Sequence, residues 1–250
     1  MECWRSRRWP VDKYLSRILF IDLSKHRYWV EEYPELFRAR IGGTGVAIEL
    51  LHEFCPHGID PLAPDAPVIL AVGPLSALFP LASKTVALFK SPHTGNLGES
   101  HCGGRSAVAL RLAGYGAVVI TGKSEIPVYL VIDGDKVLFR DARALWGLSS
   151  SFTVGRIIRE REGGSGTRSI LRIGIAGENL LTYANVIAES YRHFGRLGLG
   201  AVFGAKRLKA VVIIGKGRVP VSDPPRYSRL YRELHERAVR SDLFRKYHDL

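Results

Sequence analysis

The chain has 250 residues, of which 36 are Lys or Arg and 24 are Asp or Glu, so it carries a formal charge of +12, and 46% of its residues are apolar. This composition excludes an intrinsically disordered chain, a collagen-like repeat and a small disulfide-rich protein. The cysteines Cys3, Cys55 and Cys102 lie far apart without a Cys-x-x-Cys pair, which is typical of a reducing compartment and excludes a four-thiolate cluster site within this chain. We therefore expect a cytoplasmic protein with a sizeable apolar core.

The predicted elements are taken in chain order. Residues 1–10 are basic but no apolar stretch follows them, which argues against a secretory signal. β-Branched and aromatic runs predict a hairpin over 16–23 and 26–33, and apolar spacing predicts helices over 34–40 and from Gly42 to Pro56. Residues 67–89 contain Lys84 as their one charged residue, but prolines at 67, 74 and 80 would interrupt a membrane-spanning helix, so two buried strands are expected there.

The remaining elements mix strands and helices without a regular spacer. Strands are predicted at 68–72, 85–89, 117–121, 128–133, 137–140, 169–173, 184–188 and 209–215, and helices at 106–112, 152–161, 195–206 and 226–247. The irregular spacing does not suit a repeating βαβ array. The predicted class is therefore α+β with mixed β-sheets.

The chain divides into four segments on this prediction. Residues 1–15 form a basic N-terminal extension, residues 16–218 the main domain, and the Pro-rich residues 219–225 a linker. Residues 226–250 contain an amphipathic helix whose apolar stripe consists of Tyr227, Leu230, Tyr231, Leu234 and Ala238. Such a helix either folds back on the main domain or is the first helix of a truncated or split second domain.

A basic segment carries the main chemical signal. Between Ser190 and Ser222 there are seven basic residues and no acidic one. Residues 192–204 are rich in glycine and lie between a predicted strand and a predicted helix, where free backbone N–H groups can meet a phosphate. Arg192 and Arg196 would add charge-assisted hydrogen bonds. The segment indicates an anion site, although glycines that only permit packing, beside solvated arginines, explain the pattern equally well.

Two other patterns are weaker. A dinucleotide site on Gly198, Gly200 and Gly204 would need an acidic residue about 20 positions later, and the first candidate, Asp223, lies in the linker.

The Gly-, Ser- and His-rich residues 90–104 form a second loop element that could cradle a polar cofactor. Within it, His101 stands beside Cys102, but adjacent residues rarely supply two ligands of one tetrahedral ion.

Several short motifs occur in a fixed order. They are Ser16-Arg-Ile-Leu-Phe-Ile-Asp-Leu23, Gly73-Pro-Leu75, Lys90-Ser-Pro-His-Thr-Gly95, Cys102-Gly-Gly104, Leu112-Ala-Gly-Tyr115, Ile120-Thr-Gly-Lys-Ser124, Pro127-Val-Tyr-Leu130, Asp141-Ala142, Leu145-Trp-Gly147, Ala176-Gly-Glu-Asn-Leu180, Gly195-Arg-Leu-Gly-Leu-Gly-Ala-Val202 and Lys206-Arg-Leu-Lys-Ala210. Together, over residues 17–215, they resemble the N-terminal domain of the tungsten-containing aldehyde ferredoxin oxidoreductases.

The resemblance implies a fold and a cofactor. Residues 16–218 would form two intertwined repeats of mixed sheet with flanking helices, and would bind a tungsten (or molybdenum) bis-pterin whose phosphates are bridged by magnesium. By motif position, the cofactor would be contacted by Lys84, His101, Gly103, Arg192, Gly195 and Arg196. Arg192 and Arg196 would meet the anionic pterin groups, while His193, through its backbone carbonyl, and His101 would lie at the magnesium ion.

The resemblance also implies an activity for the complete enzyme. It would oxidise an aldehyde to a carboxylic acid and pass the electrons through a [4Fe-4S] cluster to ferredoxin. The family's cluster cysteines and catalytic residues lie in later domains, so we expect no catalytic residue in this chain and no turnover by it alone. A second polypeptide that carries those domains is the expected partner if the gene is split, and neither a membrane nor a nucleic acid is expected.

Some positions depart from the family pattern. Lys84 and His101 stand where the family usually has arginine and asparagine, so a bidentate fork becomes a point charge and an amide becomes an imidazole. These changes favour one alternative, a degenerate paralogue that serves as a scaffold. A second alternative, a basic nucleic-acid-binding module, rests on the Lys and Arg excess alone because no nucleic-acid-binding motif is present.

Overall fold

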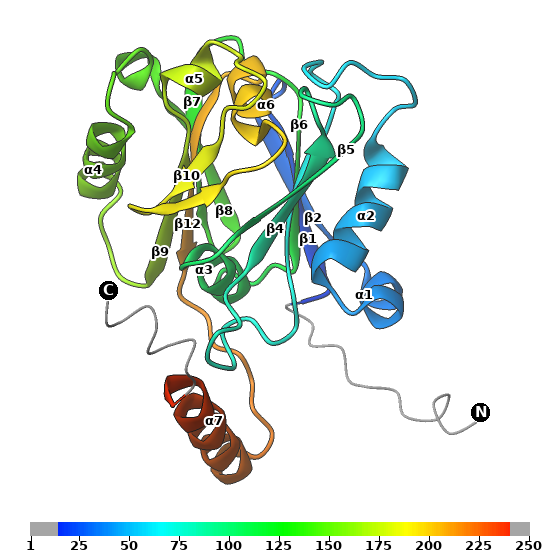
Figure 1. Cartoon of the computed structure of the whole chain (residues 1–250), viewed down its shortest axis with the longest axis vertical. Coiled ribbons are helices and arrows are strands. Elements are labelled where there is room, and N and C mark those ends of the chain that lie inside the picture. Colours follow the sequence, from blue (N-terminus) through cyan, green and yellow to red (C-terminus); the bar gives the residue numbers. More distant parts are fainter. Residues whose placement is uncertain (1–14, 241–250) are drawn as a thin grey trace.

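The computed structural model describes residues 15–240, which form two six-stranded mixed sheets flanked by helices (Figure 1). The strands of the first sheet, in spatial order, are β2 (Arg27–Glu32), β1 (Arg17–Asp22), β6 (Ala117–Thr121), β3 (Val68–Val72), β4 (Thr85–Lys90) and β5 (Leu97–Cys102). Those of the second are β11 (Arg192–Phe194), β10 (Val186–Ala188), β9 (Thr167–Arg172), β12 (Leu208–Gly215), β7 (Val128–Asp133) and β8 (Lys136–Asp141). The predicted α+β class with mixed sheets is confirmed.

The two sheets repeat one topology. Strands β1–β6 build the first sheet and β7–β12 the second. In each sheet the first strand of the opening hairpin pairs in parallel with the last strand of the set, β1 with β6 and β7 with β12, and every other pairing is antiparallel. Each strand of one repeat therefore has an equivalent strand in the other.

Helices surround the sheets and interlock them. Their bounds are α1 (Pro34–Arg40), α2 (Gly43–Phe54), α3 (Ser106–Leu112), a 3-10 turn (Arg143–Leu145), α4 (Ser151–Arg161), α5 (Ile175–Glu178), α6 (Leu199–Ala205) and α7 (Pro224–Val239). Helix α2 covers β3 and β4 of its own sheet, whereas α3, which belongs to the first repeat, packs mainly on β12 and β9 of the second. The packing is tight, because a Cβ at Gly215 would lie 2.5 Å from Ala109 O. The repeats are therefore intertwined through a helix, while each sheet belongs to one repeat.

The apolar core extends across both repeats. All residues of β3 and of β12 are buried, as expected for strands covered on both faces. The main core cluster contains side chains from both sheets and from α2, α3 and α6. A smaller cluster lies beneath α4, where Val154 and Ile158 meet Tyr129 and Ile170 of the second sheet. In Figure 1, α1 and α2 lie on one flank of the molecule and α4 on the opposite one.

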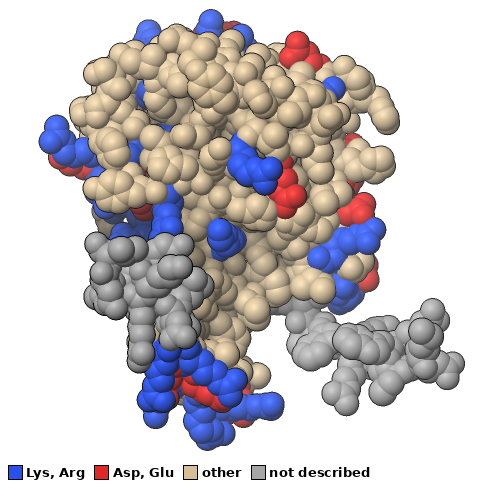
Figure 2. Space-filling view, in the orientation of Figure 1, with Lys and Arg blue, Asp and Glu red and all other residues tan. Residues whose placement is uncertain are grey.

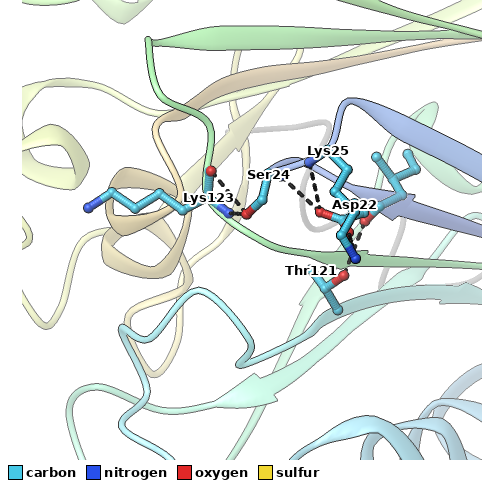
Figure 3. Close-up of polar contacts among 6 residues, drawn as sticks. Asp22, Ser24, Lys25, Thr121 and Lys123 are labelled. Carbon is cyan, nitrogen blue, oxygen red and sulfur yellow. Dashed lines mark hydrogen bonds and ion pairs between the residues drawn. The ribbon is translucent and has the colours of Figure 1, made fainter.

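Polar contacts fix the loop between the repeats to the first hairpin (Figure 3). Asp22 Oδ1 accepts hydrogen bonds from the backbone N–H groups of Ser24 at 2.9 Å and Lys25 at 3.1 Å. The N–H of Lys123 donates to Ser24 Oγ at 2.9 Å, and Ser24 Oγ–H donates to Lys123 O at 3.2 Å. Gly122 has φ +78°, and a Cβ there would lie 2.7 Å from Asp22 Oδ1. This cluster satisfies its own polar groups, so we interpret it as structural.

Two strands in the glycine-rich regions were not predicted. Residues 97–102 were expected in a loop but form β5, and residues 192–194 form β11. Both are polar edge strands, which lack the apolar alternation used to recognise strands. In β5, Gly98 is required because a Cβ there would lie 2.8 Å from the ring of Phe89 on β4.

Helix boundaries were also displaced. Helix α6 begins at Leu199 rather than at residue 195, because β11 and a turn occupy the preceding positions. Helix α7 begins at Pro224, with Asp223 as its N-cap and its side chain accepting from the N–H of Arg226 at 2.9 Å. The predicted stretch 241–247 and the basic extension 1–14 lie outside the described residues. No helix within residues 15–240 is long and apolar enough to cross a membrane.

Candidate cofactor-binding site

The candidate site of the first repeat lies where β4 begins and β5 ends. Lys84 immediately precedes β4, and Gly103 immediately follows β5. Along β5 the burial alternates, so that His101 is exposed and Cys102 buried. His101 Nε2 lies 2.7 Å from Glu99 Oε1, and Thr44 Oγ1 donates to the same oxygen at 3.1 Å. One ring nitrogen of His101 is thus occupied by a carboxylate of its own strand.

The equivalent strand ends of the second repeat hold the basic residues. Arg192 and His193 lie on β11, and Gly195 and Arg196 follow it. All four are exposed. In the strand registers, His193 pairs with Ile187 as His101 pairs with Val86, so the two histidines occupy matching positions.

The structure brings the two sets together. Strands β5 and β11 are in contact. A Cβ built on Gly104 would lie 3.3 Å from Arg192 Cγ, and the backbone N–H of Arg196 donates to Ser100 Oγ at 3.1 Å. Counted from the last residues of β5 and β11, Ser100 corresponds to Arg192, and Gly104 to Arg196. Arg192 therefore contacts Gly104, the counterpart of Arg196, and Arg196 contacts Ser100, the counterpart of Arg192. An approximate two-fold relation between the repeats produces this exchange.

The charges at this meeting point act on a buried thiol. Burial, followed by the charge of Glu189, raises the pKa of Cys102 to about 12, while the charges of Arg192 and Lys84 oppose the shift. Cys102 is therefore a neutral thiol at neutral pH and is not a ready metal ligand. Cys55, at the end of α2, is free as well, its pKa also raised by burial, and Cys3 lies outside the described residues.

The glycines at and near the strand ends fall into two groups. Gly198, at φ +85°, would place a Cβ 2.1 Å from Thr182 O, and Gly204 would place one 1.9 Å from Gly177 O. These positions serve close packing, which leaves no room for a dinucleotide on Gly198, Gly200 and Gly204. Gly103 has no atom within 4 Å of its Cβ position, and Gly195 has only His193 Cβ at 4.0 Å. The backbone at Gly103 and Gly195 is thus open to a ligand.

The donor set suits an anionic group. Lys84, Arg192 and Arg196 supply positive charge beside the open backbone of Gly103 and Gly195. Within residues 15–240 no three His, Cys, Asp or Glu side chains gather in a way that could hold a metal ion. A divalent ion here would need ligands from phosphate oxygens, backbone carbonyls or water.

The sequence prediction missed the residues that anchor the β10–β11 turn. Glu189, in this turn, has φ +52° and accepts a hydrogen bond from Ser169 Oγ. The buried Arg172 donates from Nη1 to Glu189 O at 2.6 Å and from Nε to Ser151 O. Burial lowers the pKa of Arg172, and the charge of Glu189 opposes that shift. A charged residue at the end of β9, between Leu171 and Ile173 in the sequence, was the one available signal for this anchor.

Comparison with known proteins gives a consistent result. Residues 18–215 match the sequence profile of the family described as aldehyde ferredoxin oxidoreductase, N-terminal domain. The chain is 39% identical, over 87% of its length, to the tungsten-containing aldehyde ferredoxin oxidoreductase of Thermococcus kodakarensis, and 30% identical, over 94% of its length, to the aliphatic sulfonate oxidoreductase, WOR-like subunit, of Pyrococcus furiosus.

A solved structure supports the same relationship. A chain of the active site complex BamBC of benzoyl coenzyme A reductase, in complex with 1,5-dienoyl-CoA, superposes with a TM-score of 0.82 at 32% identity over 89% of the present chain. The present chain covers 36% and 40% of the two relatives named above and 34% of this structure. It therefore spans little more than a third of the length of the proteins that it matches.

Proposed function

Because the chain belongs to the aldehyde ferredoxin oxidoreductase family through its N-terminal domain, we propose that the paired strand ends of β5 and β11 bind a tungsten (or molybdenum) bis-pterin cofactor. One observation carries the proposal: equivalent strand ends of two repeats meet and present cations beside open glycine backbone. A cofactor with two similar halves suits a protein face with an approximate two-fold relation.

Each residue has a proposed role. Arg192 and Arg196 form charge-assisted hydrogen bonds to anionic pterin groups, and Lys84 adds a point charge from the first repeat. Gly103 and Gly195 let the cofactor approach the backbone. The backbone carbonyl of His193 would hold a magnesium ion at the phosphates, and His101, whose Nε2 pairs with Glu99, would lie beside it.

The proposed activity belongs to the complete protein. The cofactor supplies the two-electron chemistry that converts an aldehyde to a carboxylic acid, and a [4Fe-4S] cluster passes the electrons to ferredoxin. We place the cluster ligands and the catalytic residues in the part of the relatives that this chain does not match. We place the protein in the cytoplasm.

Helix α7 is the proposed contact with that remaining part, in the same chain or on a second polypeptide. None of its residues is buried, and Leu230, Tyr231 and Leu234 are exposed. One end of the helix is attached to the domain, where Tyr227 OH donates to Leu78 O and the Tyr227 ring lies 5.6 Å from that of Phe79. One of the relatives is named as a subunit, which supports a partner polypeptide.

A scaffold without cofactor is the second candidate. Glu99 is 39% exposed and holds His101, so a carboxylate stands near the position proposed for the phosphates. A cofactor-free protein that retains its partner would support this candidate.

The test is cofactor content in protein purified anaerobically from a tungstate-supplied host. We expect the parent to yield bis-pterin after oxidative release, and Arg192→Ala and Arg196→Ala to yield much less. Arg156→Ala, an exposed arginine on α4, is the charge-matched control. The assignment fails if the parent carries no pterin, or if both site variants keep as much as the control.

A further inference from the structure

A second basic site is lined by residues other than those assigned to the cofactor. A cavity of about 430 Å³ is lined by Arg105, Arg159, Gly166, Thr167, Arg168 and Ile170. Its arginines come from three elements: Arg105 is the N-cap of α3, Arg159 lies in the last turn of α4, and Arg168 lies on β9. None of the cofactor-contacting residues proposed above lines it. Figure 2 shows Lys and Arg atoms at the lower left of the body.

The cavity exists because the two repeats differ in one loop. In the first repeat, residues 55–67 connect α2 to β3 and cover the end of the sheet, where Pro64 O accepts from the N–H of Gly122 at 2.8 Å and from Lys206 Nζ at 2.6 Å. In the second repeat, the corresponding connection from α4 to β9 is only residues 162–166. Beside this shorter loop, at the matching end of the second sheet, the arginines line the cavity.

One of the arginines is held rigidly and keeps a free donor. Arg168 Nη1 donates to Arg159 O at 3.1 Å and its Nη2 to Gly164 O at 2.9 Å. Its Nε is buried and has no hydrogen-bond partner. Both terminal nitrogens of Arg168 are thus engaged by the backbone, which fixes its guanidinium at the cavity wall.

The lining chemistry selects an anion. No acidic residue lines the cavity among the residues described, while Arg105 and Arg159 are exposed and available to a ligand. Guanidinium forks match the geometry of phosphate oxygens, and a cavity of this size is in the range of small-molecule sites. We propose that this arginine-lined cavity binds a small phosphate-bearing anion, independently of the pterin site.

Calorimetric titration of the full chain with inorganic pyrophosphate at about 150 mM KCl tests the proposal. The parent binds one equivalent, and Arg105→Gln and Arg159→Gln each weaken binding by about ten-fold or more, the loss expected for one charge-assisted bond. Arg156→Gln, which changes the same charge on α4 outside the cavity, leaves the affinity unchanged. Arg192→Gln, at the proposed cofactor site, can weaken only pyrophosphate bound at the strand ends and leaves the affinity of the cavity unchanged.

Three results would overturn the proposal. The first is no binding by the parent. The second is an equal loss of affinity in the Arg156→Gln control, which would indicate diffuse attraction by the net charge. The third is a loss of affinity in Arg192→Gln with none in the cavity variants, which would place pyrophosphate at the strand ends. Melting temperatures equal to that of the parent establish that the cavity variants remain folded.

Discussion

The two repeats share a topology but differ in what they place at equivalent positions. At the meeting point of β5 and β11, the second repeat contributes Arg192 and Arg196, and the first contributes Ser100 and Gly104 at the matching positions. The small residues are what allow the large ones to fit, because Arg192 Cγ lies 3.3 Å from the Cβ position of Gly104. A repeated backbone therefore provides a symmetric platform, and the side chains divide the work unequally across it.

The same division occurs in the interior. Gly116 directly precedes β6, whereas Lys209 lies at the irregularity where β12 begins to pair with β7. A Cβ at Gly116 would lie 1.8 Å from Leu15 O, and no side chain fits there. Lys209 is fully buried and pairs with Glu178. The second repeat thus contains a buried charge pair that the first cannot accommodate.

Breaking that pair is the largest effect we expect. Lys209→Met should lower the free energy of unfolding by about 3–5 kcal/mol, because it leaves the carboxylate of Glu178 buried without its cation. The double variant with Glu178→Gln should recover much of this free energy. In the parent, the N–H of Gly147 donates to Glu178 Oε2 at 2.8 Å, and an amide oxygen at the same position can still accept that hydrogen bond. Urea unfolding of the parent and both variants measures this, and a double variant no more stable than Lys209→Met would contradict it.

The unequal halves of the cofactor face give the next largest effect. Arg192→Ala or Arg196→Ala should weaken pterin retention by about 1.5–3 kcal/mol, the value of one hydrogen bond to a charged group. Lys84→Ala should lower the free energy of pterin retention by less. Lys84→Arg should strengthen retention, because it places a bidentate fork on the first repeat. Rates of pterin loss from the purified proteins check the order. Equal losses from Lys84→Ala and the arginine variants would show that the two halves contribute alike.

A third difference concerns the helix ends. The C-cap residue is Ala113 for α3 but Lys206 for α6. Lys206 Nζ donates to Pro64 O and Gly122 O, and burial lowers its pKa to about 7, against the opposing charges of Asp65 and Asp22.

This lysine predicts a pH dependence of stability. Between about pH 7 and the ordinary lysine value of 10.5, the unfolded chain binds a proton that the folded chain does not. The free energy of unfolding should therefore rise with pH in this window, by at most about 1.4 kcal/mol per pH unit, and level off below pH 7 where both states are protonated. Denaturant titrations from pH 6 to 10 should show the slope in the parent, and Lys206→Met should remove it.

The smallest effect is expected outside both repeats. Removal of residues 223–250, which include α7, should change the free energy of unfolding by less than about 1 kcal/mol, because no side chain of that helix is buried. If the proposed contact is correct, the same deletion should abolish recovery of a cysteine-bearing partner from the native host. A large drop in melting temperature would show that α7 supports the domain itself.

Much of the architecture could be predicted from the sequence, because the buried strands are continuous apolar runs. Val68–Val72 and Ala117–Thr121 were placed to the residue, as was the helix Ser106–Leu112. The polar edge strands could not be found in this way, since β5 and β11 are defined by pairing with a neighbour rather than by their own composition.

The candidate site was predicted in part. The basic, glycine-rich segment indicated an anion site, but residue types alone could not separate the open Gly195 from the packed Gly198 and Gly204, because the difference lies in neighbours distant in sequence. Glu189 and its partner Arg172 gave little signal for the same reason. The arginine-lined cavity depends on a loop comparison that becomes visible only when the repeats are aligned in space.

The position of α3 has a consequence for how the protein can fold. This helix is encoded in the first repeat but covers the second sheet, where the N–H of Gly217 donates to Leu112 O at 2.8 Å. A first half emerging alone from the ribosome has an apolar helix without its surface, and a second half alone has an uncovered sheet. Each half lacks apolar surface that the other supplies, so we expect the two halves to fold cooperatively, with contacts between distant parts of the chain.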